Sequence, residues 1–332
     1  MIKKVILLLV TFVCLTACDD GDIIVTTFDY DSDTDLSYCT NALDTTYLVE
    51  EVQLYNINDD TNESIVFNFS RDGFTGTFDR IIENGSIVKD STITIDLSTT
   101  NKITYRIFDG EIPSDYYCQS IPPSSPQVTQ EYSTLDGGTV TLNISVTYQD
   151  DDDGIPTEAN ASDDYSGPYE YLENDNDGDG LPDPLDEDDD NDNVSTATEI
   201  SENIEGYTDP STGLPDTDED GILNYLDNDD DNDGVLTRNE DLNAFDNENV
   251  VLNPTDDFNA EGIPYYLDEN SSTEITVDQY KSNTIDRTFK TTVVANNITL
   301  ENSSTGEQIT LSSLILGSFE ISTTLTVQVI AN

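Results

Sequence analysis

The chain has 332 residues, of which 70 are Asp or Glu and only 11 are Lys or Arg, so its formal net charge is −59. This charge excludes nucleic acid as a partner, because binding to phosphate backbones is driven by Lys and Arg side chains that displace condensed counterions. Histidine is absent, which excludes histidine bases and histidine-ligated metals. An apolar content of 35% is low for a globular domain, but 17 Tyr and 11 Phe are too many for a wholly disordered chain.

Residues 1–18 have the pattern of a secretory leader. Two lysines precede an apolar run over residues 5–13, which is too short to span a bilayer because a spanning helix needs about 20 residues. The sequence Leu-Thr-Ala-Cys that ends at Cys18 resembles the bacterial lipobox, whose cysteine becomes the lipidated first residue of the mature chain. Cys14 is the competing candidate but lacks a small residue just before it, and a plain cleaved signal is the alternative. We expect lipidation of Cys18 and attachment to a membrane.

Residues 19–44 begin with the acidic stretch Asp-Asp-Gly-Asp. This stretch looks like the acidic export signals of surface lipoproteins of the Bacteroidota. The resemblance implies an outer-membrane lipoprotein exposed at the bacterial cell surface, in which residues 19–44 form an acidic tether.

Loss of the leader and lipidation of Cys18 leave two cysteines, Cys39 and Cys118. Outside the cytoplasm such a pair predicts a disulfide. It would close a loop of about 80 residues, which corresponds to roughly 4 kcal/mol in the chain-entropy model. Two free thiols that serve a metal or act as a nucleophile are the alternative, although no histidine is present to pair with them.

Residues 45–148 repeatedly alternate apolar and polar side chains with the period of two that is typical of half-buried strands. The Asn84-Gly85 pair lies between two isoleucine-containing segments and predicts a tight hairpin. No stretch predicts a long amphipathic helix. The pattern predicts an antiparallel β-sandwich, and its clearest strands are expected at residues 65–69, 93–97, 103–107 and 140–148.

Residues 271–332 continue the strand pattern. These roughly 55 strand-forming residues are few for an independent sandwich. Either they form a small separate sheet, or they return to pair with the amino-terminal strands and leave the segment between as an insertion. The exposed edges of a small separate sheet favour the second arrangement. The predicted fold is therefore mainly β, with β-sandwich regions on both sides of an irregular, helix-poor array over residues 149–270.

The array repeats with a period of 41 residues, so that Asp175 recurs as Asp216 and Asp188 recurs as Asp229. Residues 150–270 hold 41 acidic side chains and one basic side chain, Arg238. A solvated acidic linker is the simplest alternative for such a composition. Against it, each sharp turn is followed by one apolar residue, and these five residues are Leu181, Val194, Ile222, Val235 and Ile263.

The spacing within the repeats matches a calcium loop. Ca²⁺ takes six to eight oxygen ligands. In a calcium loop, acids at alternate positions, a backbone carbonyl after the glycine turn at the sixth position, and an acid at the twelfth position supply them. The segment from Asp229 to Glu240 matches this loop fully. The segment from Asp188 to Glu199 matches it except at Asn193, and asparagine tolerates the left-handed conformation that glycine would supply.

The candidate calcium ligands fall into three groups along the array. The first repeat supplies Asp175, Asp177, Asp179, Asp183, Asp186, Asp188, Asp190, Asp192 and Glu199. The second repeat supplies Asp216, Asp218, Asp220, Asn224, Asp227, Asp229, Asp231, Asp233 and Glu240. A third unit with changed ligands supplies Asp257, Asn259, Glu261 and Asp268.

At the start of the array, Asp151 and Asp153 precede Gly154, but Glu158 follows too soon to close a shell, so this stretch forms at most half a site. EF-hands are not expected, because prolines and further acidic loops occupy the positions of the flanking helices. Dockerin-like pairs share the loop, but their helical spacer is not evident.

These loops resemble thrombospondin type 3 repeats over about residues 149–268. The resemblance implies acidic loops without flanking helices that wrap around several calcium ions, as in many lipoproteins of the Bacteroidota. Vertebrate repeats of this family carry disulfides, whereas this array has no cysteine, so its compactness is expected to depend on the metal.

The sequence predicts a non-enzymatic, calcium-binding surface lipoprotein that acts as a spacer or an adhesion element. Its expected partners are calcium, a membrane reached through the lipid anchor, and a surface glycan or protein. The alternative is a β-sandwich that recognises a glycan or protein and is presented by the array. An enzyme with paired carboxylates, as in glycosidases, is disfavoured because no acid pair is recognisable outside the array.

Overall fold

The computed structural model describes residues 35–39, 51–70, 82–83, 86–87, 90–119, 121, 123–201, 208–246 and 250–328. The leader, Cys18, most of the acidic tether and the Asn84-Gly85 turn lie outside these residues. The described part of the chain is mainly β, as the sequence predicts. Within it, no helix has the length and apolar character needed to cross a membrane.

Nine strands of the described chain form one antiparallel sheet in the order β1-β2-β3-β7-β8-β10-β9-β6, with β11 paired to β10. A separate hairpin pairs β4 (Ile82–Glu83) with β5 (Ser86–Ile87) at the predicted position. The strands of the sheet are β1 (Ser37–Tyr38), β2 (Glu51–Asn58), β3 (Glu63–Ser70), β6 (Asp90–Asp96), β7 (Lys102–Phe108), β8 (Val128–Thr134), β9 (Thr139–Asp150), β10 (Ser282–Asn302) and β11 (Gln308–Gln328).

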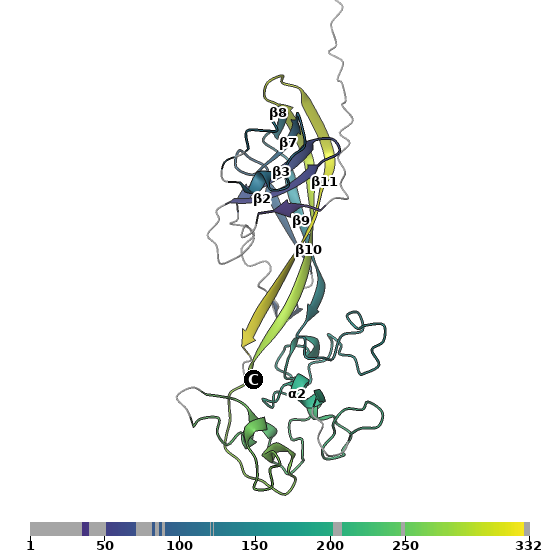
Figure 1. The fold of residues 1–332 in the computed structure, drawn as a ribbon, viewed down its shortest axis with the longest axis vertical. Coiled ribbons are helices and arrows are strands. Elements are labelled where there is room, and N and C mark those ends of the chain that lie inside the picture. Colours follow the sequence, from purple (N-terminus) through teal and green to yellow (C-terminus); the bar gives the residue numbers. More distant parts are fainter. Residues whose placement is uncertain are drawn as a thin grey trace, which may run out of the picture.

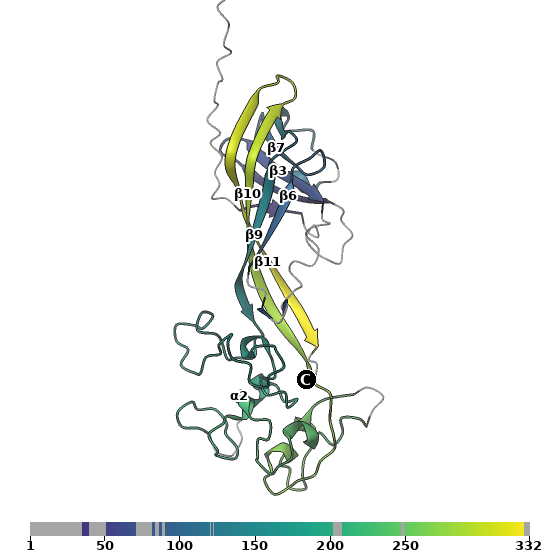
Figure 2. The ribbon, with the colours of Figure 1, turned by 180° about the vertical axis from the view of Figure 1, so that it is seen from behind.

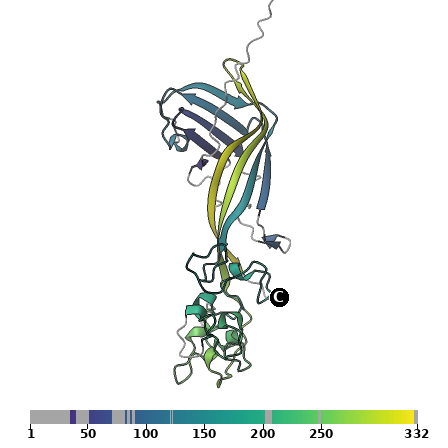
Figure 3. The ribbon, with the colours of Figure 1, turned by 90° about the vertical axis from the view of Figure 1, so that its right-hand side faces the viewer.

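The sheet curls so that its two halves face each other across one core (Figure 3). Strand β8 pairs with β7 on one side and with the end of β10 on the other, so the two layers of the expected sandwich are one continuous sheet. Alternate residues of each half point inward, as the period-two pattern requires. Leu54 and Phe67 from one half and Leu142 and Val293 from the other are at most 1% exposed in the same core.

The predicted disulfide between Cys39 and Cys118 is present, with its Cα atoms 5.3 Å apart. It joins the segment after β1 to a short 3-10 helix, η2 (Tyr116–Cys118). The first strand of the sheet is thereby tied covalently to the connection between β7 and β8.

Strands β10 and β11 form a hairpin of two 21-residue strands that extends from the curled sheet toward the array. Strand β10 also pairs with β9, with Asp286 opposite Asp150 at the far end. The carboxy-terminal strands therefore return to the amino-terminal ones, and the array leaves after β9 and re-enters at β10. Figures 1 and 2 show the sheet at one end of the molecule and the array at the other, connected by these long strands.

The array consists of turns and short helices: η3 (Asp183–Leu185), α2 (Thr196–Ser201), η4 (Asn224–Leu226), η5 (Thr237–Glu240), η6 (Pro254–Asp256) and η7 (Tyr265–Leu267). Two small apolar clusters stabilise it, and the first of them packs against the long strands. In one, Leu181 and Leu185 pack on Ile285 of β10. In the other, Ile155 packs with Leu223 and Tyr225 of the second repeat.

Candidate metal centres

The acidic loops are shaped by their own aspartates. In the first repeat, Asp190 Oδ1 accepts the amide of Asp192 at 3.1 Å, and Asp192 Oδ1 accepts the amide of Val194 at 2.6 Å. Asp231 and Asp233 repeat these bonds in the second repeat, at 3.2 and 2.8 Å. The same pattern recurs in the loops that begin at 175 and 216. One oxygen of each carboxylate is thus used to curl the backbone, and the other can point toward the loop centre.

The turns fall where the sequence predicts them. Gly180, Gly221, Gly234 and Gly262 all have φ between 87° and 100°. Asn193, which replaces the glycine, has a φ of 72°. Its side chain also bridges to the returning chain: Nδ2 donates to the carbonyl of Gln279 at 3.0 Å, and Oδ1 accepts the amide of Lys281 at 3.1 Å.

Carboxylate oxygens of the predicted ligands meet in several groups, within each of which they lie no more than 4.8 Å apart. Three of these groups follow single loops: Asp175 with Asp177 and Asp179, Asp188 with Asp190 and Asp192, and Asp216 with Asp218 and Asp220. A further group spans both repeats and joins Asp192, Glu199 and Asp230. The described residues therefore offer several oxygen-rich sites of the kind that hard cations occupy.

The site of the first repeat is fully enclosed. Asp188, Asp190, Asp192 and Glu199 are at most 3% exposed. Within the described structure, neither oxygen of Glu199 has a hydrogen-bond partner, and Oδ2 of Asp190 and of Asp192 has none. Burial and the neighbouring carboxylates raise the pKa of Glu199 and Asp190 well above their usual range. Lys281 and Arg238 are cations that act on Asp188 and Asp192. The oxygens without a donor on Glu199, Asp190 and Asp192 still require a cation or protons, because burying an unpaired charge costs several kcal/mol.

The second repeat has the same arrangement in a less enclosed form. Asp231 is 4% exposed and Glu240 is fully buried. Burial raises the pKa of Glu240 to about 9, with contributions from Asp231, Asp233, Asp229 and Asp268. The helix η7, which ends one residue before Asp268, contacts η5, so the third unit lies against the second repeat.

The remaining predicted ligands make hydrogen bonds within the loops. Asn224 Oδ1 accepts the amide of Thr217 at 2.8 Å. Asn259 accepts the amides of Glu261 and Ile263 and donates to Asp268 Oδ2 at 2.7 Å. One carboxylate oxygen of each remaining aspartate accepts a backbone amide within 3.3 Å, and these residues are Asp183, Asp186, Asp227 and Asp257. Glu261 is exposed.

Glu170 and Asp230 belong to these groups but were not predicted as ligands, and the buried Asp189 was not predicted either. Asp151 and Asp153 were predicted to form at most half a site. Asp189 and Asp230 are both 2% exposed. They are 41 residues apart, so the repeat period could have predicted that they occupy equivalent positions. Glu170 meets Asp151 and Asp153 in a further group. It follows no loop spacing, and only the fold brings it there.

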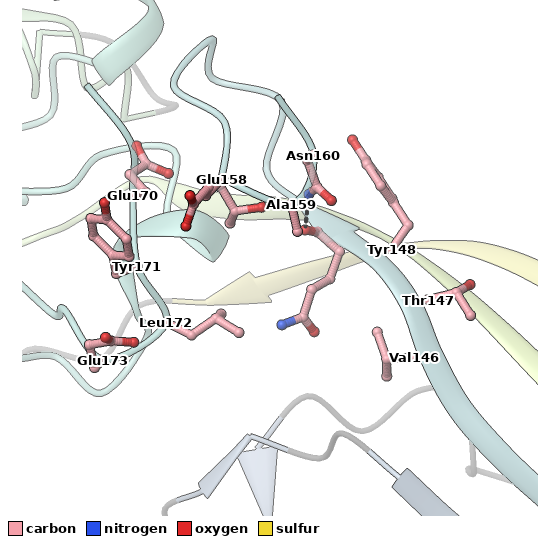
Figure 4. Close-up of a pocket in the computed structure, with 12 residues that line it drawn as sticks. Val146, Thr147, Tyr148, Glu158, Ala159, Asn160, Glu170, Tyr171, Leu172 and Glu173 are labelled. Carbon is pink, nitrogen blue, oxygen red and sulfur yellow. Dashed lines mark hydrogen bonds between the residues drawn. The ribbon is translucent and has the colours of Figure 1, made fainter. Parts of the chain in front are cut away.

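A cleft of about 570 Å³ lies beside Glu170, between the end of β9 and the start of the array (Figure 4). It is lined by residues 146–149, 157–160 and 170–173. Tyr148 and Tyr171 contribute rings, while Glu158 and Glu173 contribute acids. This size and mixed lining suit a small polar ligand.

The chain matches no family model, no curated protein and no solved structure. The resemblance to thrombospondin type 3 repeats therefore rests on the loop residues themselves.

Proposed function

We propose that the array binds several calcium ions and acts as a metal-stiffened adhesion or spacer element of a non-enzymatic bacterial surface lipoprotein. The observation that supports it best is the set of enclosed carboxylates in the first repeat, where both oxygens of Glu199 and one oxygen each of Asp190 and Asp192 have no hydrogen-bond partner among the described residues. Their spacing and number suit calcium, which accepts six to eight oxygens in flexible geometry. Mg²⁺ fits poorly, because it demands a small octahedral shell and retains its water.

The array projects from the sheet at the far end of the long strands. Leu36 donates its amide to the carbonyl of Ser318 of β11 at 2.7 Å, so the described chain begins at the curled sheet. The array lies at the other end of the long strands (Figure 1). An array that projects from the sheet in this way suits both a spacer and an adhesion element.

A calcium titration of the full chain tests this function. Native mass spectrometry should count several bound ions, and the hydrodynamic radius should fall as calcium binds and rise again with a chelator. Extracellular modules bind at about 10⁻⁴–10⁻³ M, so millimolar calcium should saturate the array. An identical radius in excess chelator and in millimolar calcium would contradict the proposal. Mass spectrometry of the mature amino terminus separately tests lipidation of Cys18.

The cleft beside Glu170 favours a second function, recognition of a small polar ligand such as a glycan. Tyr171 is 44% exposed at its rim and offers a ring on which a sugar could stack. Glycan-array binding that is lost in Tyr171→Ala would support this function. The absence of any glycan signal from the calcium-loaded chain would oppose it.

A further inference from the structure

The junction between the curled sheet and the array contains carboxylates that belong to neither calcium loop. Asp151 and Asp153 directly follow β9, and Glu170 lies further along in the connection to the first repeat. The three side chains are between 4% and 6% exposed, and an oxygen of each lies within 4.8 Å of the others.

The oxygens that meet there have no donor. Asp151 Oδ1 accepts the amide of Asp153 at 3.1 Å, and Asp153 Oδ1 accepts the amide of Ile155 at 2.8 Å. Among the described residues, Oδ2 of both aspartates and both oxygens of Glu170 have no hydrogen-bond partner. Glu170 is thus a buried, unpartnered acid that faces two others, and like charges at this separation repel strongly in a protein interior.

A fourth buried acid, Asp189, lies between Asp188 and Asp190 of the first repeat. It is 2% exposed, and neither of its oxygens has a partner in the described structure. Glu170, Asp153 and Asp151 are among the charges that act on it.

We infer that Asp151, Asp153 and Glu170 bind a divalent cation that fastens the start of the array to the end of β9. Together they offer four unpartnered buried oxygens, and backbone carbonyls or water would complete a calcium shell of six to eight. The inference rests on the proposed function, because calcium is the cation that the array would meet. It adds a site outside the loop pattern and gives that site a distinct task, the attachment of the array to the sheet.

Reciprocal variants of the full chain test the junction site. The junction variant combines Glu170→Gln with Asp153→Asn, which removes two charges while keeping the shape of the side chains. The matched control combines Asp231→Asn with Glu240→Gln, which makes the same change at the buried site of the second repeat. Ions are counted by native mass spectrometry in millimolar calcium, and hydrogen exchange is followed at residues 151–160 and 229–240. Far-UV circular dichroism verifies that the sheet of each variant is folded.

The junction variant should bind fewer calcium ions than the wild type and exchange at least about tenfold faster at 151–160, with 229–240 still protected. The control should show the reverse pattern. A junction variant with the wild-type ion count, or with unchanged protection at 151–160, would overturn the inference while leaving the loops as calcium sites. A wild-type chain that binds no calcium would overturn both this inference and the proposed function.

Discussion

At the scale of single residues, Asn193 performs two tasks that glycine could not combine. It adopts the left-handed turn, and its amide bridges the chain that returns to β10. Its counterpart Gly234 has the same backbone conformation, and a Cβ atom placed there would meet nothing within 4 Å. The sequence predicted the turn at Asn193, but the bridge depends on a partner more than 80 residues away.

Replacing Asn193 by Gly should therefore preserve the calcium loop and weaken the attachment of residues 277–281. The loss of two hydrogen bonds corresponds to about 1–3 kcal/mol of unfolding free energy. Chemical denaturation in millimolar calcium measures this loss, and hydrogen exchange locates it. Gly234→Asn, which places the same side chain where it has no such partner, is the control: strain at a φ of 94° should destabilise it, with no change in exchange at residues 277–281. Unchanged exchange at 277–281 in Asn193→Gly would assign the effect to the turn alone.

The Cys39–Cys118 disulfide should stabilise the sheet and leave the array unaffected. Replacing both cysteines by serine should lower the unfolding free energy of the sheet by roughly 4 kcal/mol, because the open chain gains entropy when unfolded. Calcium binding by the array should remain, which a titration of the reduced or substituted chain would show. A parallel loss of calcium binding would mean that sheet and array fold as one unit.

At the scale of elements, the positions of the acidic loops were predictable and the curl of the sheet was not. Local spacing fixed the loops from Asp188 to Glu199 and from Asp229 to Glu240. Period-two alternation located the strands but does not specify neighbours. The pairing of β8 with both β7 and β10, which turns two expected layers into one sheet, depends on contacts between distant segments. Glu170 could not be predicted as a ligand for the same reason, because its partners Asp151 and Asp153 are close to it in the fold but do not follow the spacing of a loop.

Substitutions in the loop from Asp229 to Glu240 should weaken its calcium binding much more than that of the loop from Asp188 to Glu199. Asp231→Asn with Glu240→Gln removes two buried acids from the second site, so its calcium affinity should fall by at least about tenfold. The loop from Asp188 to Glu199 should lose much less, because its own four acids remain. Site-resolved hydrogen exchange across a calcium titration measures both loops at once. Equal weakening of the two would show that the repeats bind cooperatively.

At the scale of the whole molecule, the charge of −59 makes the stability of the array depend on the protons or cations that neutralise its carboxylates. Burial and nearby carboxylates raise the pKa of Glu240 from 4.5 to about 9 and that of Asp231 from 3.8 to about 7. Because the folded loop then binds more protons than the unfolded loop, stability without metal falls as pH rises. The contribution of Glu240 is fully present below about pH 4.5 and is lost as pH rises through about 9.

In chelator, the array should accordingly be most compact near pH 4 and should expand as the pH is raised to 8. In millimolar calcium the dependence should be opposite in sign, because protons compete with the metal for the same oxygens. The hydrodynamic radius, measured across this range in both solutions, tests the two trends together. Radii that do not respond to pH in chelator would contradict the assignment of these carboxylates to enclosed sites.

The attachment of the array to two neighbouring strands has a mechanical consequence. The array leaves the end of β9 and enters the start of β10, which are paired at Asp150 and Asp286. If calcium holds the array compact, a tensile force on the array pulls β9 and β10 in one direction along their axes. The hydrogen bonds of these strands to β6, β8 and β11 then resist the force together in shear. If the array is extended without calcium, the segments that follow β9 and precede β10 are pulled apart. The hydrogen-bonded pairs between β9 and β10 then separate one after another, starting at Asp150. Single-molecule pulling through the array should therefore record a higher rupture force in calcium than in chelator.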